Sequence, residues 1–215
     1  MRKVLGLLLL FFVSTLVSFG QKAKPVFEVV PLGVYGGIDE RNLSAYLVAP
    51  IGTKEYVCLD AGTVHSGIEK AIEKGTFSVP SSTVLRQYIK GYCISHAHLD
   101  HVSGLIINSP ADSTKTVYAI APAMKMMQNH YFNDQTWANF GDEGLGKPLK
   151  KYHFETLSFG KTIPISNTSM TVQAFPLSHV NPYESTAFLI KKDNNAILYL
   201  GDTGPDAVEK TTNLA

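Results

Sequence analysis

Three histidines and one aspartate fall within six residues, His96 to His101, in the sequence HAHLDH. The apolar segment GYCIS before them is predicted to be a strand, and VSGLIINS after them has the apolar spacing of a short helix. Side chains two residues apart on a strand emerge from the same face, so His96 and His98 can bind one metal ion. Asp100 and His101 lie where the chain turns into the helix, from where they can reach a second ion. Imidazoles and a carboxylate without a thiolate suit Zn²⁺, or Mn²⁺ and Fe²⁺ in a comparable geometry.

Such a site needs further ligands from elsewhere in the chain. His179 in AFPLSH and Asp202 in ILYLGD each follow a predicted strand. His179 could complete a three-histidine set with His96 and His98, or it could lie in a surface loop. Asp202 could bridge two ions, or it could form a turn or a helix N-cap. Asp60 in LDAG could orient a ligand histidine through a hydrogen bond, although turn formation explains it equally well.

Predicted strands and helices alternate along the chain, which indicates an α/β protein whose sheets are covered by helices. The predicted helices are IEKAIEKG, which stops at Gly75, VSGLIINS, and AMKMMQNHYF. The segment NDQTWANFGDEGLGKP has the composition of a long loop. The predicted strands are VFEVVPLG, LSAYLVAP, EYVCLD, GYCIS, TVYAIAP, YHFETL, MTVQAFPLSH, STAFLIKK and NAILYLGD.

The first 20 residues are predicted to be a secretory signal peptide. Arg2 and Lys3 form a short positive region, an apolar stretch follows, and Ser18-Phe19-Gly20 matches a small-x-small cleavage signal. A membrane anchor is the alternative, but the apolar run is shorter than the ~20 residues needed to span a bilayer. We therefore expect a periplasmic or secreted protein without a stable membrane anchor after cleavage.

Charge and cysteine content give two further expectations. The chain has 19 basic and 18 acidic residues, so its overall charge gives no indication of nucleic acid as a partner. The two cysteines, Cys58 and Cys93, could pair in an exported protein, but both lie in predicted strands, where buried free thiols are favoured.

These residues together resemble the metallo-β-lactamase fold superfamily, whose hallmark is His-x-His-x-Asp-His. The run HAHLDHVSGLIINSP resembles, along its whole length, the signature of the class II cyclic-nucleotide phosphodiesterases. The resemblance also covers PLGVYGGIDERNLSAYLV, LDAGT, HYFNDQTWANFGDEG and LYLGDTGPD, which together span most of residues 29–206.

The resemblance implies an αββα four-layer sandwich and an enzyme that opens the 3',5'-cyclic phosphate of cAMP, with cGMP as an alternative substrate, to the 5'-nucleotide. It implies two divalent metal ions, with Zn²⁺ as the expected metal. The first ion would be bound by His96, His98 and His179, and the second by Asp100 and His101. Asp202 lies between the ions, and Asp100 is also the expected catalytic residue.

The chain departs from the family pattern in one respect, because the further histidine that such proteins supply to the second metal would lie beyond Ala215. We therefore expect residues 21–215 to form one metallo-hydrolase domain that is incomplete at its C-terminus. Trp137 and Phe140 are expected to contact the adenine base of the nucleotide, or else only to anchor the long loop to the core. Two other functions remain open: another metallo-β-lactamase-fold esterase, because fold and metal centre do not determine the substrate, and an inactive fragment.

Overall fold

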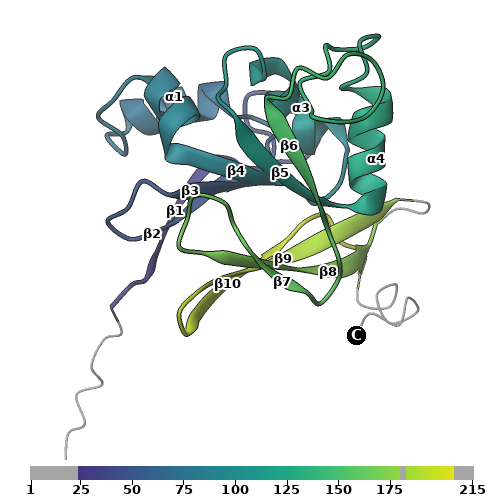
Figure 1. Ribbon diagram of the computed structural model, residues 1–215. Helices are drawn as coiled ribbons and strands as arrows, with labels where there is room; N and C mark the ends of the chain where they lie inside the picture. Colours follow the sequence, from purple (N-terminus) through teal and green to yellow (C-terminus); the bar gives the residue numbers. More distant parts are fainter. Residues whose placement is uncertain (1–23, 180–182, 206–215) are drawn as a thin grey trace, which may run out of the picture.

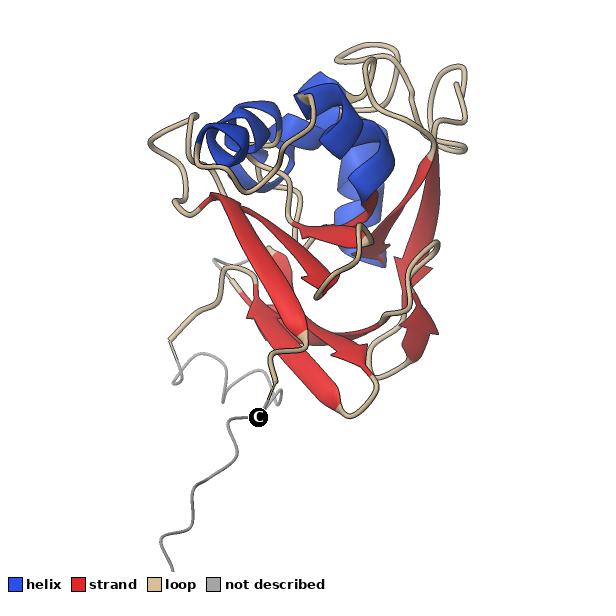
Figure 2. Ribbon diagram, turned by 90° about the vertical axis from the view of Figure 1, so that its left-hand side faces the viewer, coloured by secondary structure: helices blue, strands red, loops and turns tan. Residues whose placement is uncertain are grey.

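The computed structural model describes residues 24–179 and 183–205. The predicted signal peptide, residues 1–20, lies outside the described residues. Two β-sheets face each other, and helices cover the outer face of the first sheet (Figures 1 and 2). Among the described residues, no helix is both long enough and apolar enough to cross a membrane.

The first sheet has six strands in the order β1-β2-β3-β4-β5-β6. The pairs β1·β2 and β2·β3 are antiparallel, whereas the pairs β3·β4, β4·β5 and β5·β6 are parallel. Parallel neighbours need crossover connections, and helices supply several of these. The strands are β1 (Phe27–Gly33), β2 (Ala45–Pro50), β3 (Tyr56–Leu59), β4 (Ile89–Cys93), β5 (Lys115–Ile120) and β6 (Tyr152–Leu157).

The helices pack on the outer face of this sheet through small and aliphatic side chains. Helix α1 (His65–Glu73) buries Ile68 and Ala71, and its end is followed by Gly75 at φ +78°, at the predicted stop. Helix α3 (Leu99–Asn108) buries Val102 and Leu105. The remaining helical segments are α2 (Ser81–Thr83), the π-helix η1 (Val84–Tyr88) and α4 (Ala121–His130).

The second sheet is antiparallel, with the order β10-β9-β8-β7. Val172 and Ala174 on β8, and Phe188 and Ile190 on β9, belong to one buried core together with the first sheet. Their two-residue spacing is what a strand with one buried face requires. The strands are β7 (Thr162–Pro164), β8 (Thr171–Ser178), β9 (Glu184–Lys192) and β10 (Asn195–Leu200).

The predicted α/β class is confirmed. Of the four expected layers, the described residues form three: helices, first sheet and second sheet. Within these residues, no helix covers the outer face of the second sheet. Both cysteines are buried free thiols, as favoured from the sequence.

Strand register brings the histidine cluster to one edge of the two sheets. Leu59 at the end of β3 pairs with Cys93 at the end of β4, and the backbone N–H of Asp60 donates to the Cys93 carbonyl at 2.9 Å. The segment that follows β4 therefore starts beside Asp60. In the second sheet, His179 lies directly after β8 and Asp202 lies shortly after β10.

Candidate metal centre

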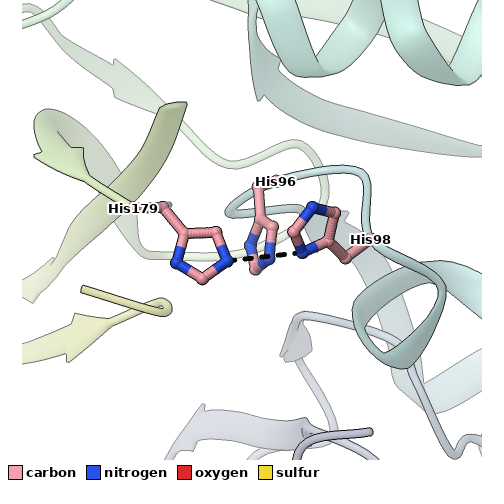
Figure 3. Close-up of side chains that lie close together, drawn as sticks. All are labelled: His96, His98 and His179. Atoms are coloured by element: carbon pink, nitrogen blue, oxygen red, sulfur yellow. Dashed lines mark hydrogen bonds between the residues drawn. The ribbon is translucent and has the colours of Figure 1, made fainter. Parts of the chain in front are cut away.

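His96, His98 and His179 form the first group of potential metal ligands. One nitrogen of each side chain lies within 4.8 Å of the others, and the three rings converge on a common point (Figure 3). His179 Nε2 and His98 Nδ1 are 3.3 Å apart. The sequence predicts these three residues as ligands of one ion, and the structure brings them together from the ends of β4 and β8.

His96, His101 and Asp202 form the second group, again with ligand atoms within 4.8 Å of one another. Asp202 lies between the two groups, because its carboxylate is 3.3 Å from His101 Nε2 and 3.8 Å from His179 Nε2. This is the position that a bridging carboxylate would occupy. The grouping differs from the expected one in that His96, rather than Asp100, completes the second set.

Asp100 lies at the second position of α3, next to this set. Its Oδ2 is 3.6 Å from His101 Nε2 and accepts a hydrogen bond from the backbone N–H of Gly37 at 3.0 Å. The other carboxylate oxygen of Asp100 has no protein donor among the described residues. The hydrogen bond from Gly37, in the loop before β2, therefore fixes one oxygen of Asp100 and leaves the other oxygen available to the cluster.

Two buried nitrogens in the cluster fit a metal ion. Within the part of the chain that the structure describes, His96 Nε2 and His101 Nε2 have no hydrogen-bond partner. Buried polar atoms normally have one, and an unpaired imidazole nitrogen facing other imidazoles and a carboxylate is a typical metal ligand. The donor set thus matches the nitrogen and oxygen ligands that Zn²⁺ and similar divalent ions take.

The surroundings shift the pKa values of two histidines in the cluster in opposite directions. Burial, together with the neighbouring His101, lowers the pKa of His96 to about 4, so its ring is neutral. Burial also lowers the pKa of His101, but the adjacent carboxylates of Asp202 and Asp60 outweigh it and raise this pKa to about 10. His101 in turn lowers the pKa of Asp202 to about 2. A metal ion that takes up His101 must therefore displace its Nε2 proton.

Asp60 is fully buried and accepts four hydrogen bonds. Its Oδ2 accepts from His101 Nδ1 at 2.7 Å, Tyr199 OH at 2.6 Å and Ser95 Oγ at 2.8 Å, and its Oδ1 accepts from the Ser95 backbone N–H at 2.7 Å. An ionised carboxylate only accepts, so His101 Nδ1 carries a proton and Nε2 faces the cluster. The structure thus gives Asp60 the orienting contact considered in the sequence analysis.

Ser95 likewise determines which ring nitrogen of His96 carries the proton. Its hydroxyl donates to Asp60, so its oxygen is left to accept from His96 Nδ1, 3.0 Å away. The proton on Nδ1 leaves His96 Nε2 as the free lone pair in the cluster. Neither Ser95 nor Tyr199 stood out in the sequence, because a serine in a strand end and a tyrosine in a strand have ordinary structural roles.

Trp137 and Phe140 do not lie at the cluster, so the expectation that they contact the base is not supported by their placement. Trp137 Nε1 donates to Ser109 Oγ at 3.0 Å, after the last residue of α3. The cluster is at the first residues of this helix, and ten residues of helix span about 15 Å. Lys151 Nζ lies over the Phe140 ring and donates to the Ser109 carbonyl, which places Phe140 at the same far end.

Two bacterial relatives of the chain are described as 3',5'-cyclic-nucleotide phosphodiesterases. The chain is 42% identical over 219 residues to a probable 3',5'-cyclic-nucleotide phosphodiesterase of Yersinia pestis, covering 97% of this chain and 64% of that protein. It is also 42% identical over 217 residues to a 3',5'-cyclic-nucleotide phosphodiesterase of Aliivibrio fischeri, covering 96% of this chain and 65% of the relative. The chain therefore spans slightly less than two thirds of the length of these relatives.

Solved structures show the same fold. Unliganded yeast PDE1 matches with a TM-score of 0.73 at 20% identity, over 83% of this chain and 66% of that one. The metallo-β-lactamase fold protein YhfI from Bacillus subtilis matches with a TM-score of 0.56 at 16% identity, over 82% of this chain and 62% of YhfI. The expected metallo-β-lactamase-like fold is confirmed. Residues 26–215 match the family model described as class-II cAMP phosphodiesterases, and the chain belongs to that family.

Proposed function

We propose that the protein hydrolyses the 3',5'-cyclic phosphate of cAMP, with cGMP as an alternative substrate, to the 5'-nucleotide. Family membership supports this function, and so do the descriptions of the two bacterial relatives. The observation that carries it is the convergence of His96, His98, His179, His101 and Asp202 from separate strand ends into two adjoining ligand groups.

We propose that the two groups hold two divalent metal ions, with Zn²⁺ as the first choice. The unpartnered Nε2 atoms of His96 and His101, and the position of Asp202 between the groups, support this. When bound, such ions polarise phosphoryl oxygens, neutralise the charge of the phosphodiester and activate water. A nearly neutral protein then needs no wide basic surface to bind its substrate.

The side chains around the cluster hold protons at defined atoms. Asp60 and Ser95 keep the Nδ1 protons on His101 and His96, and both Nε2 atoms therefore face the substrate side. Asp100, with one oxygen held by Gly37, has its other oxygen available to accept a proton from water. In the overall reaction a water oxygen forms a bond to phosphorus, the bond from phosphorus to O3' breaks, and O3' leaves with a proton.

The experiment for this function measures cAMP hydrolysis and metal content on one preparation. We expect 5'-AMP as the product, loss of turnover in chelator, and recovery on addition of Zn²⁺. Asp100→Ala should abolish turnover, whereas Asp39→Ala, which removes an aspartate paired with Arg41 in an exposed loop, should not. A metal-loaded protein that ignores cAMP and cGMP but cleaves another ester would contradict the proposal.

We also propose that the protein is exported to the periplasm or secreted. The pattern of residues 1–20, with a positive start, an apolar stretch and a small-x-small end, supports this. Fractionation of producing cells, with N-terminal sequencing of the mature protein, tests it. Export with a new N-terminus at Gln21 is expected, and an intact Met1 in the cytoplasmic fraction would contradict it.

A further inference from the structure

A cavity of about 280 Å³ opens directly beside the metal-ligand groups. It lies between α4 and the start of β9, and His96 and His98 form part of its wall. Pockets for whole small-molecule ligands are roughly 300–1,000 Å³, so this cavity is suited to one ring system of a larger ligand. A ligand whose phosphate lies at the histidines can therefore place a neighbouring ring here.

The walls of this cavity are largely apolar. The Tyr183 ring stands against the His98 ring, with centroids 4.6 Å apart and planes at 74°. Pro122 and Met126 line the α4 side, and Met126 is 39% exposed. Aromatic rings and thioethers form favourable contacts with other rings. Adenine and guanine can both stack on such side chains, because every base has a π-face.

Besides the two histidines, three polar or charged side chains line the cavity: Lys125 and Asn129 on α4, and Glu184 at the start of β9. Lys125 and Asn129 are four residues apart on α4, so they lie on the same face of that helix. Among the described residues, the Asn129 carboxamide makes no hydrogen bond, while its backbone carbonyl accepts one from Asn133 Nδ2 at 2.8 Å. Its carboxamide can therefore pair with a ligand.

The two side chains offer different patterns to a purine. A carboxamide can accept from the N6 amino group of adenine and donate to N7, whereas lysine only donates and suits O6 and N7 of guanine. We propose that this cavity binds the nucleobase of the cyclic nucleotide, with Asn129 on the edge of adenine and Lys125 on the edge of guanine. The inference rests on the proposed function, because that function supplies the nucleotide.

Filling the cavity tests where the base binds. Met126→Trp places an indole in the space of the base. The KM for cAMP should rise at least about tenfold, which corresponds to about 1.4 kcal/mol of lost binding. Hydrolysis of 1-O-methylribose 3',5'-cyclic phosphate, which has no base, should stay within about twofold. Ile107→Trp is the matched control, because Ile107 is 65% exposed on α3 and does not line the cavity.

Two outcomes of this experiment overturn the base site. One is an unchanged KM for cAMP in Met126→Trp. The other is an equal loss of activity on cAMP and on the base-free substrate, because the cavity would then serve the shared ribose phosphate or support the metal ligands.

Changing the polar edge tests how the base is recognised. Asn129→Leu should raise the KM for cAMP several-fold more than the KM for cGMP, because a lost hydrogen bond corresponds to about 1 kcal/mol. Lys125→Met should instead raise the KM for cGMP more than the KM for cAMP. His130→Leu, next to Asn129 but outside the cavity lining, should change neither. Equal effects on both nucleotides in the two edge variants would overturn the assignment of these residues.

A binding measurement separates this inference from the proposed function. 5'-AMP is titrated into the chelator-treated protein and followed by NMR, so that turnover plays no part. A wild type that binds 5'-AMP but never hydrolyses cAMP, with binding lost in Met126→Trp, supports the base site and contradicts the function. A wild type that hydrolyses cAMP while Met126→Trp binds 5'-AMP normally supports the function and overturns the base site.

Discussion

His101 donates its Nδ1 proton to Asp60 Oδ2 at 2.7 Å, and both side chains are almost completely buried. This contact fixes which nitrogen of His101 faces the metal-ligand groups. Because Ser95 and Tyr199 donate to the same carboxylate, one buried aspartate on the first sheet is linked to the ligand histidines and to the second sheet.

Asp60→Asn should weaken Zn²⁺ binding by about 10- to 100-fold, the usual effect of losing an outer-shell partner of a metal ligand. Donors converge on both oxygens of Asp60, so the amide NH₂ group of asparagine must face at least one of them. Competition with a chromophoric chelator measures the affinity. Asp142→Asn is the matched control, because Asp142 pairs with His153 away from the cluster. Unchanged affinity in Asp60→Asn would contradict the orienting role.

Tyr199→Phe should lower the free energy of unfolding by about 1–2 kcal/mol, because the Tyr199 hydroxyl donates one hydrogen bond to Asp60 and accepts another from Ser44 Oγ, 3.0 Å away. Asp60 keeps its other donors. Urea unfolding of the metal-free protein measures this change. Tyr46→Phe serves as the control: the Tyr46 ring centroid lies 5.7 Å from that of Tyr199, and the Tyr46 hydroxyl makes no hydrogen bond to another described residue. Equal effects of the two substitutions would argue against a specific Tyr199–Asp60 bond.

Gly201→Ala should destabilise the protein by about 1–3 kcal/mol, the usual range for overpacking, and should weaken metal binding as well. A Cβ at Gly201 would lie 2.5 Å from the Ser95 Cβ, so the two sheets would have to move apart beside Asp202. Thermal unfolding with and without Zn²⁺ measures both effects. Leu200→Ala, at a residue that is 51% exposed, should change metal binding little. A Gly201→Ala protein with wild-type stability and affinity would contradict this close approach.

His153 should make stability depend on pH. A hydrogen bond to Asp142 raises the pKa of His153 above its usual value. The contribution is therefore fully present below the unfolded pKa of about 6.5 and is lost as pH rises through the higher folded pKa. The pair is partly exposed, so its contribution should be below about 1 kcal/mol. Urea unfolding of the metal-free wild type and His153→Gln at pH 5.5 and pH 9 measures it. A difference as large at pH 9 as at pH 5.5 would contradict the ion pair.

Much of the fold could be predicted from local pattern. The apolar spacing before and after HAHLDH predicts β4 and α3, and Gly75 marks where α1 has ended. The π-helix at Val84–Tyr88 was not predicted, because its sequence VLRQY has no turn or capping signal. The short strand β7 was missed because three residues are too few to show a period.

The site was less predictable wherever it depends on contacts between distant segments. His179 and Asp202 follow strands, so their convergence could be expected from topology. Tyr199 could not be identified, because its partner Asp60 lies 139 residues away in the chain. The placement of Trp137 and Phe140 beyond the far end of α3 could not be predicted, because aromatic composition does not say at which end of a sheet a loop lies. The cavity beside α4 is likewise visible only once β9 is packed against that helix.

The most direct test of the account is anomalous diffraction from a crystal grown with Zn²⁺. Two zinc peaks are predicted, one within reach of His96, His98 and His179 and the other beside His101, Asp100 and Asp202. A single peak elsewhere on the surface, or no peak with these side chains turned away from one another, would contradict a dinuclear metal centre.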